Sequence, residues 1–442
     1  MRQARQRGFV LVTALLVITG LATLASVTLT RSMTELAASQ RFVAAQQSFA
    51  LSEGGLDQGI AWMRSQPAPP TCLLGAVCVV YNTVQTLATG TQTITITPAS
   101  NNGASYQDAY TITTTSTSSG IAVNKTLNLT MQIESFARYA YFSDQEMLPG
   151  GTKIWFTDQS HIRGPTHSND QFHIRGNPVF DGAVSTASPT IDYGGCGPPN
   201  DNPQFNGGLT LGADKIDMPQ PSLNDLQSEA SLVVQGNTTA KLEGKYLRLT
   251  TNGITQVVPI STNPVVFVNG GDLTIDGGTL DGQLTLISNK SVKLNGSVTY
   301  ACNPENPTGD ADCLDGQSGN VAYNDDILGI VASNNVTVSR DAPNDMTIQG
   351  TIMAVQGSFG VENYQNGLKG TLHIYGGLIQ KVRGAVGTFS SSTLAKVSGY
   401  SKDYWYDERL LSLSPPRYPT TGTYQILFWQ DQSVAGQAPS GQ

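Results

Sequence analysis

Four histidines are the most obvious candidate metal ligands in this 442-residue sequence. His161, His167 and His173 follow one another at intervals of six residues, and His373 stands apart. On a straight strand, six residues span about 20 Å, so these rings could share an ion only if the chain folded tightly between them. The tetrapeptide HIRG begins at His161 and again at His173, which favours equivalent positions on neighbouring turns of a repeat. We therefore expect the histidines to make hydrogen bonds within the fold.

An aspartate-rich loop is the second candidate site. Asp310, Asp312 and Asp315 precede Gly316 in the order D-x-D-x-x-D-G, which differs from the EF-hand order D-x-D-x-D-G. Carboxylate oxygens are the ligands that Ca²⁺ prefers. Calcium is therefore the one cofactor for which we consider a site, and a solvated loop without metal is the favoured interpretation.

No catalytic motif stands out. The sequence has no G-x-S-x-G, no phosphate-binding P-loop and no H-E-x-x-H, so it lacks these signs of a serine hydrolase, a nucleotidase or a zinc protease. Cleavage of a sugar bond needs two carboxylates across a cleft, and no spacing here selects such a pair. We expect no catalytic residue and a protein that is not an enzyme.

The five cysteines favour disulfides in an oxidising compartment. Cys72 lies close to Cys78, and ten residues separate Cys302 from Cys313. Outside the cytoplasm each pair would form a disulfide that closes a short loop. Cys196 is left over, and the sequence does not decide its state.

Charge is low and unevenly placed. Lys and Arg number 25 and Asp and Glu 33, a net charge of −8, and charged residues make up 13% of the chain against about 25% in typical domains. No basic cluster follows residue 8, which argues against nucleic-acid binding.

Arg2, Arg5 and Arg7 are followed by no charged residue until Arg31. The apolar span at 9–30 is long enough to cross a bilayer, and the preceding arginines favour a cytoplasmic N-terminus.

The helical pattern continues beyond the apolar span. Apolar residues recur at helical spacings up to Arg64, and Pro67 ends the pattern. One helix is therefore expected over 9–66, and we expect Gly54, Gly55 and Gly59 to bend it.

This N-terminus resembles the class III signal of type IV pilin-like proteins. The residues that carry the resemblance are Gly8, Phe9, the apolar helix and the segment ALSEGGL at 50–56, which is similar to the helix end of PilX-like minor pilins. An ordinary signal anchor would lack this combination. The resemblance implies a leader at 1–8 that prepilin peptidase removes between Gly8 and Phe9, with N-methylation of Phe9.

Thr13 departs from the pattern of major pilins. In the family, the fifth mature residue is a Glu that is thought to pair with the N-terminal ammonium of a neighbouring subunit. An unpaired carboxylate in lipid is costly, and a subunit with no pilin above it needs none. Thr13 therefore favours a minor subunit, with the filament tip as one of the locations it fits. The implied partners are other pilins and minor pilins, bound through the helix.

Beyond the helix the chain reads as β structure, so the expected class is α+β. Alternating residues predict a small antiparallel meander, followed by short strands broken by Gly or Asn. The short strands favour a β-solenoid, similar to a right-handed β-helix, over a β-sandwich. Five blocks resemble an uncharacterised domain attached to PilX-type N-termini, and no activity comes with that family. These blocks are 163–182, 328–338, 352–359, 372–380 and 399–411. The expected parts are a leader (1–8), a helix (9–66, membrane-spanning at 9–30), a meander (67–137), a solenoid-like domain (138–431, with a looser insertion at 183–260) and a tail (432–442).

Two functions follow as hypotheses. The first is a non-catalytic, minor pilin-like subunit of a type IV pilus or related secretion pseudopilus, which acts in filament assembly at the tip or in surface contact. It would sit in the inner membrane before assembly, and then in the pilus or periplasm. The alternative is a membrane-anchored solenoid that binds or cleaves carbohydrate. The aromatic segment around Tyr404 and Trp405 is expected to cap the open end of the solenoid, or else to form a binding face.

Overall fold

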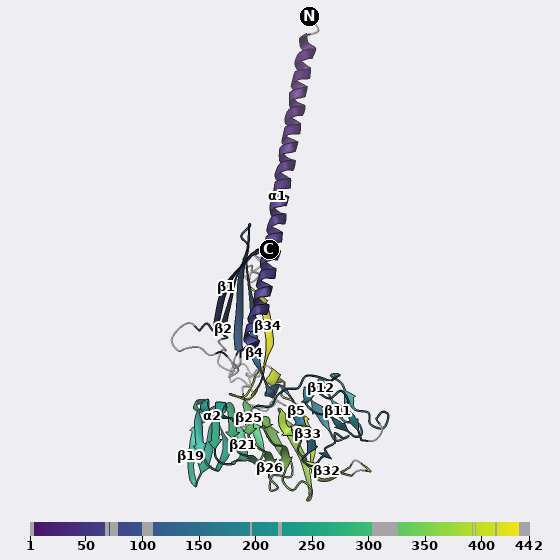
Figure 1. The fold of residues 1–442 in the computed structure, drawn as a ribbon, viewed down its shortest axis with the longest axis vertical. Helices are drawn as coiled ribbons and strands as arrows, with labels where there is room; N and C mark the ends of the chain where they lie inside the picture. The colour runs from purple at the N-terminus through teal and green to yellow at the C-terminus, as the bar shows by residue number, and fades with distance from the viewer. Residues whose placement is uncertain are drawn as a thin grey trace. The chain divides into compact units, whose positions relative to one another are not determined.

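The protein is α+β and divides into two compact units. The computed structural model describes residues 4–66, 70, 78–99, 109–194, 197–219, 223–302, 326–390, 392–393, 395–411 and 413–432. Residues 1–100, 108–132 and 424–442 form unit 1, and residues 101–107 and 133–423 form unit 2. Unit 1 contains the long N-terminal helix, and unit 2 consists almost entirely of β-strands (Figure 1). The predicted α+β class is confirmed.

Unit 1 packs one end of a long helix against an antiparallel sheet. Helix α1 (Ala4–Arg64) is continuous over 61 residues. Neighbouring strands β1 to β4 pair antiparallel in chain order, which confirms the antiparallel sheet expected from the alternating residues. In spatial order the strands are β1 (Tyr81–Leu87), β2 (Gly90–Pro98), β3 (Ala109–Ser118), β4 (Asn124–Ser135) and β34 (Thr420–Asp431).

Strand β34 was not expected in this sheet. We predicted that 138–431 would belong to the second domain, and the structure differs at the end of this range because β34 pairs beside β4. Lys125 of β4 forms an ion pair of 2.6 Å with Asp431, and Trp429 meets Phe49 of α1 edge to face. In chain order, the main segment of unit 2, 133–423, is therefore an insertion between two adjacent strands of the sheet in unit 1.

Glycines let the helix approach the sheet closely. A Cβ atom at Gly55 would lie 2.9 Å from Cγ2 of Thr114, and one at Gly59 would lie 2.7 Å from Cγ2 of Ile112. Ser52 Oγ lies 2.7 Å from Ser116 Oγ in the same buried interface. Helix α1 continues through these glycines without a break, and the bend expected there stays a prediction. Close packing, rather than flexibility, explains the glycines at 55 and 59.

Unit 2 is built on two large sheets with mostly parallel pairing. The first is ten-stranded in the order β15 (Leu209–Leu211), β12 (Val184–Thr186), β9 (Thr166–Ser168), β5 (Tyr141–Gln145), β31 (Leu378–Val382), β28 (Thr351–Ala354), β25 (Ile327–Ala332), β22 (Gln283–Ser288), β20 (Val265–Asn269) and β16 (Leu232–Gln235). Strands of this sheet alternate along the chain with strands of the second. Consecutive strands of one sheet therefore stack in parallel.

The second sheet follows the same order. Its main path is β14 (Gln204–Phe205), β11 (Val179–Phe180), β8 (His161–Arg163), β33 (Lys396–Trp405), β30 (Leu368–Tyr375), β27 (Met346–Gln349), β24 (Val298–Tyr300), β21 (Leu273–Leu280), β17 (Thr238–Gly244), β18 (Tyr246–Thr251) and β19 (Ile254–Pro259). Strands β23 (Val292–Leu294), β26 (Val336–Val338), β29 (Phe359–Val361) and β32 (Gly387–Phe389) pair beside it. Strands β17 to β19 are joined by antiparallel pairing.

Smaller elements complete the unit. Two-stranded pairs join β6 (Met147–Leu148) with β7 (Thr152–Lys153) and β10 (His173–Ile174) with β13 (Asp192–Tyr193). Among the described residues of this unit, the helices are α2 (Asn224–Ser228) and the 3₁₀ turns η1 (Phe136–Arg138), η2 (Ile260–Thr262) and η5 (Glu408–Leu411).

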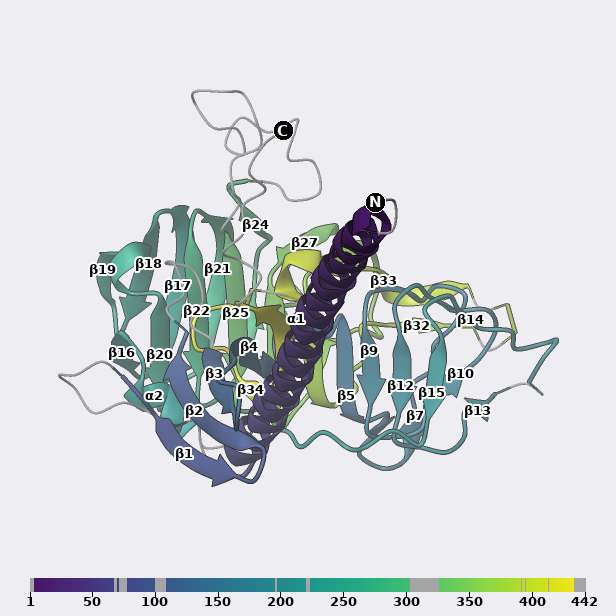
Figure 2. The ribbon, with the colours of Figure 1, turned by 90° about the horizontal axis from the view of Figure 1, so that it is seen from above.

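The two sheets close at a seam in their middle. The first strand of the ten-stranded sheet is β5, which lies inside the sheet, and the next strands along the chain extend from it to the edge strand β15. The following strand, β16, lies at the opposite edge. The chain then returns strand by strand until β31 pairs with β5 and β33 pairs with β8, both in parallel. Figure 2 shows β9, β12 and β15 on one side of β5, and β25, β22 and β20 on the other. We call the junction of β31 and β33 with β5 and β8 the seam.

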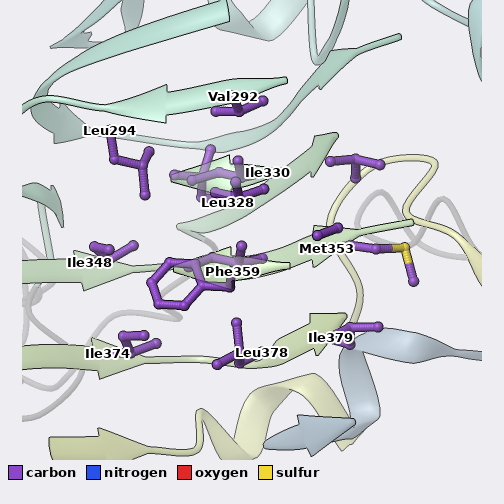
Figure 3. Close-up of a cluster of buried hydrophobic side chains, with 14 of the residues drawn as sticks. Val292, Leu294, Leu328, Ile330, Ile348, Met353, Phe359, Ile374, Leu378 and Ile379 are labelled. Carbon is purple, nitrogen blue, oxygen red and sulfur yellow. The ribbon is translucent and has the colours of Figure 1, made fainter. Parts of the chain in front are cut away.

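The interior of unit 2 is apolar on both sides of the seam. Aliphatic side chains of successive strands stack on one another, with Phe359 among them (Figure 3). Phe156, Phe172 and Phe180 form edge-to-face or tilted ring contacts on the other side. The expected cap is wrong for β33, because this strand lies between β30 and β8 and buries Tyr404. The segment predicted as a looser insertion, 183–260, supplies strands to both sheets, from β12 to β19.

Candidate functional site

The first candidate site is the uncovered half of α1. Every side chain from Phe9 to Phe42 is exposed in this chain, and Phe9 itself is 73% exposed. Within the described residues, α1 is the helix whose length and composition allow it to cross a membrane. Gly8 and Phe9, the predicted processing pair, both lie within this helix. None of the described residues covers these apolar side chains, so they fit an environment of lipid or other protein.

Thr13 is satisfied within its own helix. Its hydroxyl donates to the carbonyl oxygens of Phe9 and Val10, each at 3.0 Å. Thr19 and Thr23 make the same type of bond one turn back. A hydroxyl bonded in this way carries no unpaired donor into an apolar environment. These three threonine hydroxyls therefore require no partner from a second chain.

The predicted disulfide and calcium residues are only partly described. Cys78 and Cys302 are each disulfide-bonded. Cys72, Cys196 and Cys313 lie outside the described residues, so the pairings remain predictions. The predicted calcium loop, Asp310, Asp312 and Asp315, also lies outside the described residues.

The histidines make separate hydrogen bonds. His173 Nδ1 lies 2.7 Å from Asp192 Oδ2, on the paired strand β13. The other three rings bond Asp181 (His161), Ser185 (His167) and Asp403 (His373). In the described part of the chain, no three His, Cys, Asp or Glu side chains gather as a metal site. The HIRG expectation is wrong, since β8 pairs with β11 and β33, whereas β10 pairs with β13.

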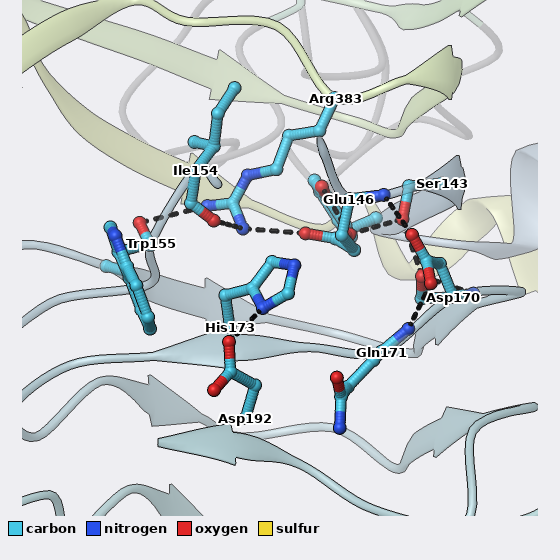
Figure 4. Close-up of polar contacts among 12 residues, drawn as sticks. Ser143, Glu146, Ile154, Trp155, Asp170, Gln171, His173, Asp192 and Arg383 are labelled. Atoms are coloured by element: carbon cyan, nitrogen blue, oxygen red, sulfur yellow. Dashed lines mark hydrogen bonds and ion pairs between the residues drawn. The ribbon is translucent and has the colours of Figure 1, made fainter. Parts of the chain in front are cut away.

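The seam contains a buried ion pair. Arg383 Nη1 lies 2.8 Å from Glu146 Oε2, and both side chains are at most 2% exposed (Figure 4). Arg383 also donates to the carbonyl oxygens of Ile154 and Trp155. The second carboxylate oxygen of Glu146 accepts bonds from Tyr141 and Ser143. Both charges therefore have hydrogen-bond partners, which a buried ion pair needs in order not to destabilise the fold.

A cavity lies beside this ion pair. Its volume is about 60 Å³, and its lining includes Trp155, Ser160, Tyr400 and Lys402. Lys402 belongs to β33, where it alternates with the buried Tyr400 and Tyr404. Alternate residues of a strand share a face, so Lys402 is on the interior face. Burial and the nearby positive charge of Arg383 lower the pKa of Lys402 to about 7, although Glu146 acts in the opposite direction.

Sequence reasoning missed Glu146, Arg383 and Lys402. The ion pair joins residues 237 positions apart, and no local pattern marks its members. Lys402 did carry a signal, because the sequence Tyr-Ser-Lys-Asp-Tyr places a lysine on the aromatic face of an alternating strand. A lysine at such a position is either snorkelling to solvent or lining an internal space.

The chain is similar to a known family model over part of its length and to a solved pilin structure. A family model described as a domain of unknown function (DUF4900) matches residues 105–196, which is less than half of the chain. Comparison with curated protein sequences gives no match. Among solved structures, the chain is similar to the competence-associated pilin ComZ from Thermus thermophilus, with 13% identity and a TM-score of 0.34. That similarity covers 88% of this chain and 98% of the other.

Proposed function

We propose that this protein is a minor pilin-like subunit that the exposed half of α1 anchors in the inner membrane and later packs into a filament. The observation that carries the proposal is the division of α1. Its first part, from Phe9 to Thr30, is apolar, uncharged and uncovered, while its last turns pack against the sheet of unit 1. An uncovered apolar helix of this length fits both lipid and a bundle of identical helices.

The preceding arginines and Gly8–Phe9 support processing by prepilin peptidase, with the N-terminus cytoplasmic before cleavage. Thr13 supports a minor role, because its hydroxyl forms hydrogen bonds within α1. It therefore needs no ion pair with the N-terminal ammonium group of a neighbouring subunit. The partners would be the helices of other pilins. The location would be the inner membrane first and the filament or periplasm afterwards.

Unit 2 would be the part that the filament presents. The parallel order of its two sheets supports a β-solenoid that is closed at the seam. The proposed role is non-catalytic, in assembly at the filament tip or in contact with surfaces. The main segment of unit 2, 133–423, is continuous with unit 1 at both of its ends.

Mass spectrometry of the mature N-terminus tests the proposal. In cells with prepilin peptidase, we expect a chain that begins with N-methylated Phe9, and in cells without the enzyme an intact N-terminus at Met1. Gly8→Leu should leave the chain uncut in both. Phe9→Leu is the matched control, because it keeps the glycine and should still be cut. An uncut wild-type chain, or a cut elsewhere, would contradict the proposal.

A further inference from the structure

We propose that the cavity at the seam binds a small monocarboxylate, whose carboxyl group pairs with the amine of Lys402. The cavity is lined by the amine of Lys402, by apolar side chains such as Ile154 and Val386, and by hydroxyl groups. Its second lysine, Lys396, already donates to the carbonyl oxygens of Lys369 and Gly370. Its volume of about 60 Å³ is less than half of the roughly 150 Å³ that accommodates benzene in an engineered protein cavity. The size therefore fits an acid of two to four carbons. This inference is independent of the pilin-like role.

Charge balance selects an anion. Arg383 forms an ion pair with Glu146, and both charges act on the amine of Lys402. Two basic groups therefore share one carboxylate. That carboxylate is already occupied by Arg383, Tyr141 and Ser143. Among the described residues, no hydrogen bond or ion pair joins the amine of Lys402 to another group. A bound carboxylate would supply the missing negative charge and favour the protonated amine.

The groups around Lys402 predict how binding depends on pH. Because burial and Arg383 lower its pKa to about 7, binding of an anion near pH 7 should draw in about half a proton. The affinity should be about tenfold weaker at pH 8 than at pH 6, since the protonated fraction falls by that factor. The titratable and charged groups that line the two cavities at the seam or act on the amine are Arg383, Glu146, Tyr141, His161, Lys396, Tyr400 and Tyr404.

The test is calorimetric titration of propionate into the full chain in detergent, at pH 6, 7 and 8 and in buffers of different ionisation enthalpy. We expect saturable binding with the stated pH dependence and proton uptake, and no binding of propionamide, the neutral counterpart. Lys402→Met should abolish propionate binding while raising the urea midpoint, because burial and the charge of Arg383 disfavour the protonated amine at this position. The urea midpoint shows directly that the variant is folded.

Two further variants separate Lys402 from its surroundings. Lys381→Gln removes the same charge from β31 outside the cavity and should bind propionate as the wild type does. His161→Gln removes an ionisable side chain that lines the second cavity at the seam, and it should keep the pH dependence. Absence of binding to the wild type, equal binding to Lys402→Met, or an affinity that does not change between pH 6 and 8 would overturn the proposal.

Discussion

The two units bring their parts together with different chemistry. In unit 1, the helix and the sheet meet through glycines and through hydroxyls such as those of Ser52 and Ser116. In unit 2, the seam is joined by the full charges of Arg383 and Glu146. Burying a hydroxyl costs little free energy once it is hydrogen-bonded, whereas a buried charge strongly destabilises the fold when its partner is lost. Unit 1 should therefore be sensitive to side-chain size, and unit 2 to the loss of single charges.

The largest expected effect is at the buried ion pair. Glu146→Gln leaves the Arg383 guanidinium without a counter-charge at a site that is at most 2% exposed. We expect the free energy of unfolding of unit 2 to fall by about 3–5 kcal/mol, the usual cost of breaking a buried pair. Urea unfolding of the full chain in detergent, followed by circular dichroism, measures the change.

Glu362→Gln is the matched control. It removes the same charge from an ion pair with Lys293 that is 31–43% exposed, and such pairs contribute less than about 1 kcal/mol. If Glu146→Gln were as mild as this control, the seam would not depend on its charges, and the contrast between the units would fail.

The second-largest effect is expected from larger side chains at the glycines of α1. Gly59→Leu would force a Cβ into a position 2.7 Å from Cγ2 of the buried Ile112. Overpacking of this kind typically costs about 1–3 kcal/mol. Gly54→Leu makes the same change where a Cβ has nothing within 4 Å, and it should stabilise the helix by about 0.8 kcal/mol through helix propensity.

Thermal unfolding of both glycine variants checks this prediction. Opposite shifts of the unfolding midpoint are expected from the same substitution five residues apart. Equal shifts would mean that the glycines act through backbone flexibility, as the sequence alone implied, and not through close approach to β3.

The same contrast explains what the sequence could predict. The helix and strands β1 to β4 follow from local periodicity, because their pairing joins neighbours along the chain. The pairing of β34 with β4 and the seam join segments hundreds of residues apart, and nothing in Thr420–Asp431 or around Arg383 specifies the partner. Of the candidate site, Thr13 and the apolar helix were predictable, and the cavity was not, because two distant strands must meet to form it.

The smallest effect is expected at a seam charge close to solvent. Asp403 of β33 accepts bonds from His373 and from Arg163 of β8, and its side chain is 36% exposed. Burial alone would raise the pKa of Asp403, but these two donors outweigh it and hold the pKa below its ordinary value. A carboxylate with a lowered pKa adds stability above its unfolded pKa, about 3.9, and this stability is lost as the pH falls through the folded pKa.

Asp403→Asn should therefore lower stability at pH 7 by no more than about 1 kcal/mol, because solvent screens the charges. The difference from the wild type should shrink as the pH drops below about 4, where the wild-type carboxylate also becomes neutral. Urea midpoints of both proteins between pH 7 and pH 3 measure this convergence. If the difference between the two midpoints stayed constant with pH, Asp403 would act through shape and hydrogen bonding alone. Arg383 and Glu146 would then be the charged pair on which the seam depends.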